Sequence, residues 1–245
     1  MEEGLGFGSE VYLKIVLKNV LGQRYIGDGL RQRVRIEVEG VPGNDLGAFM
    51  DGALIEVFGN AQDGVGNTMN SGKIIVHGDA GDIVGHSMRG GEIYIKGDIG
   101  YRGGIHMKSY LEKVPVIVIG GSAGDFLGEY MAGGIIIVLG IGNKKPSTVW
   151  FGPTSNSIVG YHVGTGMHGG RIYIRGSKDT VEDYRLGKEA RKVDLDEEDR
   201  KILSLYIGNF CKYFGMAEKD IVPSCHKFVK LVPSTYRPYG KLYAY

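Results

Sequence analysis

The feature that most constrains this chain is a repeat of 19 residues that closes on a glycine. Counting back from Gly97, a glycine lies 12 residues before it, a methionine 9 before, and isoleucines 4 and 2 before. The same positions recur ahead of four other glycines, Gly59, Gly78, Gly140 and Gly176, and a further copy ends at Gly120. Repeats of this length are typical of solenoids, in which each copy adds one coil to a continuous core.

Each copy has room for one short strand, a glycine corner and a second apolar segment, but not for a helix as well. In the copy ending at Gly97, alternation at two-residue spacing directs Ile93 and Ile95 inward and Tyr94 and Lys96 outward. The repeat therefore predicts an all-β fold, a parallel β-helix whose coils stack about 4.8 Å apart.

Two columns of buried side chains are expected to run along the stack. The residues four before each closing glycine should form the first, which contains Ile36, Ile55, Ile74, Ile93, Val116, Ile136 and Ile172. The second contains Met50, Met69, Met88, Met107, Met131 and Met167. Because methionine is a common filler of irregular cores, we interpret this column as packing and not as a soft-metal site.

The repeated glycines are predicted to be structural, since a corner needs positive φ or leaves no space for a Cβ. They are Gly47, Gly66, Gly85, Gly128 and Gly164 early in the copies, and Gly59, Gly78, Gly97, Gly140 and Gly176 at their ends. A dinucleotide site would need a glycine motif between a strand and a helix. No helix fits within a copy, so the pattern does not indicate nucleotide binding.

The composition divides the chain into three parts. Residues 1–32 are expected to cap the first coil, 33–176 to form the β-helix, and 177–245 to form a partly helical tail on the last coil or on a partner. In the tail, Asp194–Glu198 should begin a helix, Gly215 should end it, and Phe228–Pro233 is strand-like. Two insertions, Lys108–Pro115 and Ile141–Asn156, interrupt the period and should form surface loops.

No set of residues predicts catalysis or metal binding. Asp79 and Asp98 each follow a closing glycine, where an Asx side chain bonds the turn backbone, and we interpret Asp82 and Asp125 in the same way. The other reading of these acids is the carboxylate cluster of a carbohydrate-active β-helix. His86 and His106 should meet at one corner of adjacent coils, but a metal site needs three or four ligands. We therefore predict no catalytic residue and no metal site.

Charge and cysteine content exclude several functions. The chain has 29 Lys and Arg against 28 Asp and Glu, and the net charge of +1 argues against electrostatic binding to nucleic acid or membrane. Its 2 cysteines, Cys211 and Cys225, give neither a disulfide framework nor a metal-site spacing. No apolar run reaches the roughly 20 residues of a membrane span, and without a secretion signal the expected location is the cytoplasm.

The repeat resembles the GXGXG β-helix domain that forms the C-terminal part of the large (alpha) subunit of glutamate synthase. The resemblance is carried by Tyr25–Leu30, Gly47–Met50, Gly78–Gly85, Met88–Gly91, Met131–Gly134 and the closing Phe228–Tyr236. It implies a right-handed, single-stranded β-helix of about seven coils. It also implies a non-catalytic domain, because in that family the β-helix supports the catalytic domains.

The partners follow from the same resemblance. The chain has no N-terminal cysteine nucleophile and no cysteine cluster for an iron–sulfur centre. The expected role is therefore a stand-alone scaffold subunit, without a cofactor of its own, for amidotransferase and FMN/iron–sulfur synthase subunits in glutamate biosynthesis. The alternatives are the C subunit of a formylmethanofuran dehydrogenase-like complex and, less favoured, a stand-alone carbohydrate-active enzyme.

Two regions carry aromatic side chains that the repeat does not need. The second insertion contains Trp150 and Phe151, and the tail contains Tyr236 and Tyr239. Aromatic residues are enriched at protein interfaces, so these four are predicted partner contacts. A contact between copies of the chain, as a homo-oligomer, stays open, and so does packing of these residues on the chain's own solenoid.

Overall fold

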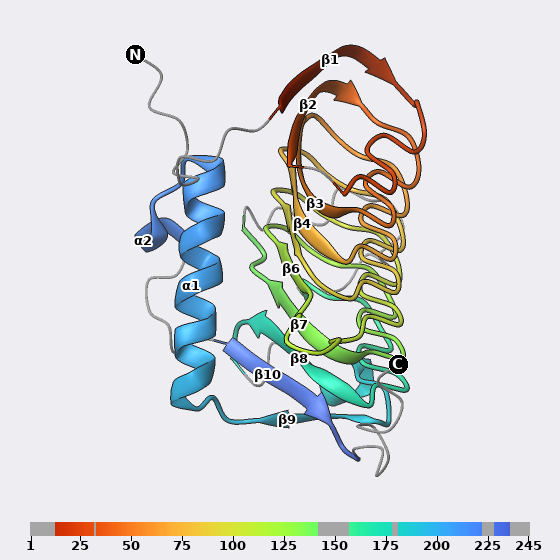
Figure 1. The fold of residues 1–245 in the computed structure, drawn as a ribbon. Coiled ribbons are helices and arrows are strands. Elements are labelled where there is room, and N and C mark those ends of the chain that lie inside the picture. Colours follow the sequence, from red (N-terminus) through yellow and green to blue (C-terminus); the bar gives the residue numbers. More distant parts are fainter. Residues whose placement is uncertain (1–12, 32, 142–156, 178–180, 222–227, 236–245) are drawn as a thin grey trace.

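The computed structural model describes residues 13–31, 33–141, 157–177, 181–221 and 228–235. They form a right-handed parallel β-helix with one long helix along its side (Figure 1). Strands β1 to β8 pair in parallel in chain order, and they are β1 Leu13–Leu21, β2 Val34–Val41, β3 Asp51–Phe58, β4 Ser71–Val76, β5 Glu92–Ile95, β6 Val116–Ile119, β7 Ala132–Val138 and β8 Gly169–Arg175. The predicted fold class is confirmed.

The β-helix starts earlier than the sequence indicated. β1 pairs in parallel with β2, with Ile15 opposite Ile36, so the part of residues 1–32 that the structure describes belongs to the stack and not to a separate cap. The first regular corner follows β1 at Gly27, which has φ +74° and leaves space for Cδ1 of Ile55. Lys14 and Lys18 on β1 pair with glutamates of β2 on the outside of the sheet.

The isoleucine column is present with one correction. Partner residues in the ladder are Ile36, Ile55, Ile74, Ile93, Ile117, Ile136 and Ile172, all buried in one core. Val116, predicted for this column, instead pairs with Glu92 and Ile135 and lies in a second core outside the sheet.

The reason for this slip is the identity of the closing glycine. The Gly121 N–H donates to Gly97 O at 2.9 Å and the Gly140 N–H donates to Gly121 O at 3.0 Å. Gly121, not Gly120, therefore closes that coil, and the spacing from Gly121 to Gly140 returns to 19 residues. The adjacent glycines made the register ambiguous by one residue, and a shift of one residue exchanges the two faces of a strand.

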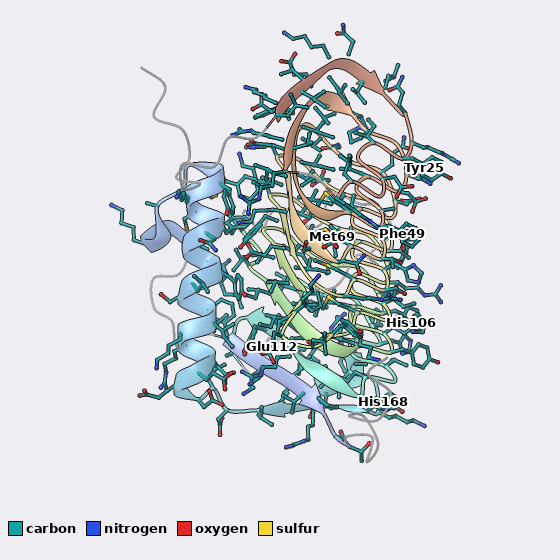
Figure 2. All side chains as sticks on the ribbon, in the orientation of Figure 1. Tyr25, Phe49, Met69, His106, Glu112 and His168 are labelled. Atoms are coloured by element: carbon teal, nitrogen blue, oxygen red, sulfur yellow. The ribbon has the colours of Figure 1, made fainter. Side chains whose placement is uncertain are left out.

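The methionine column is fully buried, as predicted. Met69 lies inside the stack in Figure 2, and the other five methionines of the column are equally inaccessible to solvent. Methionine and isoleucine columns run side by side in the same core. Their burial removes each coil's apolar face from water only when the neighbouring coils are in place.

Each coil turns back through a corner whose central glycine leaves space for a side chain of a neighbouring coil, which is an isoleucine everywhere except at Gly164, where it is Ala190. Gly85 has φ +68°, and a Cβ built on it would lie 2.5 Å from Cδ1 of Ile117. Gly47 and Gly128 have the same relation to Ile74 and Ile172. These early glycines thus serve two purposes, because they adopt left-handed backbone angles and leave space for an isoleucine methyl group.

The closing glycines make room for a ladder of Asx side chains. Oδ1 of Asn60, Asp79 and Asp98 accepts a hydrogen bond from the backbone N–H of Asp79, Asp98 and Ser122, respectively, in the next coil. A Cβ on Gly78 or Gly97 would collide with these oxygens. The aspartates bond the backbone as predicted, but they join successive coils and do not merely close their own turns.

The tail closes the last coil and then returns along the stack. The 3₁₀ helix Asp183–Arg185 leads to β9 (Ala190–Val193), α1 (Glu197–Phe214), α2 (Glu218–Ile221) and β10 (Phe228–Pro233). β10 pairs antiparallel with both β8 and β9, which covers the edge of β8. Helix α1 begins at Asp196 with a capping box and ends at Gly215, which has φ +62°.

Helix α1 covers the outward face of the sheet (Figure 1). Leu203, Ile207 and Phe210 pack there against a second core that includes Tyr94, Val118 and Ile137. Tyr94 faces outward, as the alternation predicts, yet it is fully buried because the helix lies over it. Its hydroxyl donates to Glu92 Oε2 at 2.8 Å and accepts a hydrogen bond from Asn209 Nδ2 at 3.3 Å.

A buried carboxylate holds the first turn of α1 to the sheet. Asp199 is inaccessible to solvent and accepts hydrogen bonds from the Tyr173 hydroxyl at 2.6 Å and from Lys230 Nζ at 2.7 Å. Its other contacts are Arg171, at 3.4 Å, and the N–H of Asp196, at 2.8 Å. Burial and the bond to Asp199 raise the pKa of Tyr173, which keeps this hydroxyl a donor.

The corner geometry predicts a large effect for Gly85→Ala. The new Cβ would enforce left-handed angles on an L residue and displace the buried Ile117, so we expect a loss of about 2–4 kcal/mol in unfolding free energy. The control is Gly208→Ala in α1, where no atom lies within 4 Å. Alanine is favoured there by about 0.5–1 kcal/mol. Urea denaturation measures both, and equal effects would contradict the corner model.

The anchoring of α1 gives a second prediction. Asp199→Ala would leave Lys230 buried beside a cavity without its main partner, so we expect a loss of about 3–5 kcal/mol. The control is Asp183→Ala, because Asp183 pairs with Lys192 at 2.8 Å while its side chain is 90% exposed. Exposed pairs contribute less than about 1 kcal/mol. Thermal and urea unfolding should separate the two variants, and a stable Asp199→Ala protein would show that the cluster is dispensable.

Candidate interaction surface

The corners opposite α1 form a strip of exposed side chains built on unusual backbone. In each corner the residues two before and two after the central glycine also have positive φ, between 52° and 74°. Their N–H groups donate to one neighbouring coil and the central glycine donates to the other, as Ile83, Gly85 and Ser87 show. Side chains at the two outer positions point away from the core, and Tyr25, Phe49 and His106 project from this margin in Figure 2.

Side-chain size varies widely along each of the two outer columns. The first contains Tyr25, Asp45, Gly64, Ile83, Arg102, Phe126 and His162, and the second contains Gly29, Phe49, Thr68, Ser87, His106, Tyr130 and Gly166. Left-handed angles disfavour a bulky L residue by roughly 1–2 kcal/mol relative to glycine. Large residues nevertheless fill both columns between Arg102 and His162, in the last coils of the stack.

We call this group the aromatic corner, and it contains Arg102, His106, Phe126, Tyr130, Tyr161 and His162. His106 and Tyr130 stack with ring centroids 5.3 Å apart, and Phe126 and His162 stack at 4.7 Å. The Arg102 guanidinium lies 5.3 Å from the Phe126 ring, and that of Arg185 lies 4.6 Å from the Tyr161 ring. The group is exposed apart from the half-buried Phe126, and contacts between neighbouring coils order it.

The predicted meeting of His86 and His106 is observed, with ring centroids 6.1 Å apart. Burial, reinforced by the positive potential of His106, lowers the pKa of His86. A lowered histidine pKa means that the folded protein favours the neutral ring. The contribution of His86 to the free energy of unfolding therefore decreases as the pH falls below the ordinary histidine pKa. No group of three or more metal-ligating side chains gathers anywhere in the described ranges.

The four aspartates discussed as a possible carboxylate cluster all bond the backbone. Oδ1 of Asp82 accepts a hydrogen bond from the N–H of Tyr101, and Oδ1 of Asp125 accepts one from the N–H of Tyr161, both at 2.7 Å. Asp79 and Asp98 serve the ladder described above. These bonds favour turn chemistry over the paired carboxylates that glycoside hydrolysis needs.

A second surface feature is a cleft of about 550 Å³ between α1 and the starts of β7 and β8. Its floor is Gly133, Gly134 and Gly170, and its walls include Leu205, Tyr206 and Val114. Leu205 is 57% exposed in this cleft. The charged residues at its end, Arg171 and Lys230, already contact the carboxylates of α1.

The partner contacts predicted from sequence, Trp150, Phe151, Tyr236 and Tyr239, lie outside the described residues. The aromatic corner was not predicted as a surface. Its signal was present in the sequence, because all its members except Tyr161 lie two residues before or after Gly104, Gly128 or Gly164. Side chains at that spacing point outward only if alternate residues have left-handed backbone angles, and the sequence pattern alone does not reveal those angles.

None of the helices in the described segments combines the length and apolar character required to cross a lipid bilayer.

Comparisons with known proteins agree with the repeat. A family model described as the GXGXG motif matches residues 13–234. The chain is also 51% identical, over 233 residues, to an uncharacterized protein of Methanocaldococcus jannaschii. That match covers 94% of this chain and 85% of the relative. Since the matched range extends from β1 to just past β10, the chain belongs to the GXGXG-motif family.

Proposed function

We propose that this chain is a non-catalytic scaffold subunit of a glutamate synthase-like oxidoreductase, on which amidotransferase and FMN/iron–sulfur synthase subunits assemble. The observation that carries the proposal is the extent of the family match, which spans residues 13–234 and so occupies nearly the whole chain. The resemblance of this repeat to the supporting domain of glutamate synthase supplies the kind of complex.

The interior of the solenoid supports a scaffold role. The isoleucine and methionine columns fill the space between coils, and both belong to one continuous core. The buried carboxylate Asp199 is satisfied by Tyr173 and Lys230. This carboxylate is therefore held by structural contacts and is not a free general acid or base.

The glycine-rich corners are unsuited to a nucleotide or flavin phosphate. Phosphate loops bind through backbone N–H groups that point at the ligand. Here the N–H groups of Gly66, Gly85 and Gly104 donate at 2.7–2.8 Å to carbonyls of the neighbouring coil. A phosphate at these glycines would break the bonds that hold the stack together, so FMN is assigned to a partner.

Cofactor content provides one test. The chain, expressed alone and purified, should show no flavin absorbance at roughly 350–500 nm, where oxidised flavins absorb, and no stoichiometric iron. The reason is that the proposal assigns the cofactors to partner subunits. Absorption spectra and elemental analysis measure both. A yellow or brown protein with one FMN or cluster per chain would contradict the scaffold assignment.

Assembly provides the decisive test. The chain, tagged at its own locus and purified without added salt, should retain an amidotransferase subunit and an FMN/iron–sulfur subunit. When a two-electron donor is supplied, the complex should form two glutamates from one glutamine and one 2-oxoglutarate. An untagged strain is the control for adventitious capture. Recovery of formylmethanofuran dehydrogenase-like subunits would replace this proposal by the alternative complex, and hydrolysis of a polysaccharide by the chain alone would replace both.

A further inference from the structure

The aromatic corner has a conformational penalty that folding does not require. Arg102, His106, Phe126, Tyr130 and His162 all have φ between 52° and 63°, a region that disfavours bulky side chains. The same two columns contain Gly29 and Gly64 in other coils, so the repeat accepts glycine at these positions. Strained residues that persist on a surface point to a role other than stability.

The packing of the rings decides what kind of ligand they suit. The planes of His106 and Tyr130 are inclined by 10° and those of Phe126 and His162 by 17°, so each pair covers one face of each ring. A Cβ on Gly166 would collide with the ring of Tyr130, which places the next coil against that ring as well. Sugars and nucleobases stack on free ring faces, whereas here mainly the edges are exposed.

The charges in the corner are neutralised within it. Arg102 Nε lies 3.0 Å from Glu129 Oε2, and Arg185 Nε donates to Glu182 Oε2 at 2.8 Å. Tyr130 and Tyr161 are 48% and 42% exposed between these pairs. A patch of aromatic edges without excess charge lacks the basic groove that nucleic acids need. It matches the composition of protein interfaces, where tyrosine, phenylalanine and arginine are enriched.

We propose that the aromatic corner is the docking surface for a partner subunit of the complex, through an uncharged apolar region of that subunit's surface. The inference rests on the proposed function for the existence of a partner, and it assigns the place of contact. Stacking between coils holds the rings in fixed orientations, so little side-chain entropy is lost when the partner binds. The left-handed backbone directs His106, Phe126, Tyr130 and His162 outward from three successive coils.

The test uses full-length variants that remove aromatic rings and also relieve the backbone strain of a bulky residue at positive φ. Phe126→Gly and Tyr130→Gly, combined, should weaken binding of the subunits co-purified with wild-type chain by at least about tenfold in Kd. Their melting temperature should stay within about 5 °C of wild type, because glycine suits the backbone and offsets the lost stacking. The matched control is Thr68→Gly with Ser87→Gly, in the second outer column, which should bind as wild type does.

Two further variants separate the remaining explanations. Tyr130→Lys retains an apolar stem beside Gly166 and adds a charge, so it should also weaken binding even if the glycine variant fails to fold. Leu205→Lys places a charge in the cleft beside α1 and should leave binding unchanged.

The outcomes for this surface and for the proposed function are distinguishable. If folded Phe126→Gly/Tyr130→Gly protein or folded Tyr130→Lys protein binds the partner with wild-type affinity, the docking surface is wrong and the scaffold proposal stands. The same conclusion follows if Leu205→Lys is the one variant that loses binding. Recovery of a different complex by wild-type chain overturns the glutamate synthase assignment, and the same variants then decide whether that complex docks here. Recovery of no subunit overturns both.

Discussion

The contact between the central glycine of one corner and an isoleucine of a neighbouring coil is the interaction on which this structure depends. Because Gly85 has no Cβ, the methyl group of Ile117 reaches the corner and the coils stack in register. The isoleucine and methionine columns are consequences of that register. The Asx ladder then fixes the opposite end of each strand, since Asp79 and Asp98 bond the coil that follows.

A solenoid whose outward strand face is apolar must cover that face, and α1 does so here. Leu203, Ile207 and Phe210 bury the outward residues of the central strands. At one end of the helix, Asp199 meets Tyr173 and Lys230, and at the other, Tyr213 accepts a hydrogen bond from Lys73. Polar contacts at the two ends and an apolar middle fix both the position and the direction of the helix.

The repeat predicted the parts of the fold that recur, and its failures have local causes. Identical spacing was sufficient for the methionine column, the corner glycines and all but one member of the isoleucine column. The assignment of Val116 was wrong because Gly120 and Gly121 are adjacent and an insertion precedes them. The start of the stack was missed because β1 shows apolar alternation without the glycine grid.

Surface properties were harder to predict than the core. The helix boundaries at Asp196 and Gly215 followed from capping chemistry, but the place where α1 docks depends on contacts between Tyr213 or Asp199 and strands more than 25 residues away. The aromatic corner depends on alternate left-handed residues, a conformation that Phe126 and Tyr130 do not suggest by type. Both features arise from tertiary structure that no local pattern encodes.

The position of α1 also determines how the solenoid loses its structure. In a stack held only by neighbouring coils, unfolding starts at an end and proceeds one coil at a time. Helix α1 contacts Lys73 in β4 through Tyr213, and it contacts Tyr173 in β8 through Asp199. It therefore connects the coils between these two strands. We expect those coils to unfold together, whereas β1 lies beyond the helix with Leu13 and Leu21 exposed. The end at β1 is therefore expected to open before the coils that α1 covers, and the aromatic corner lies among those covered coils.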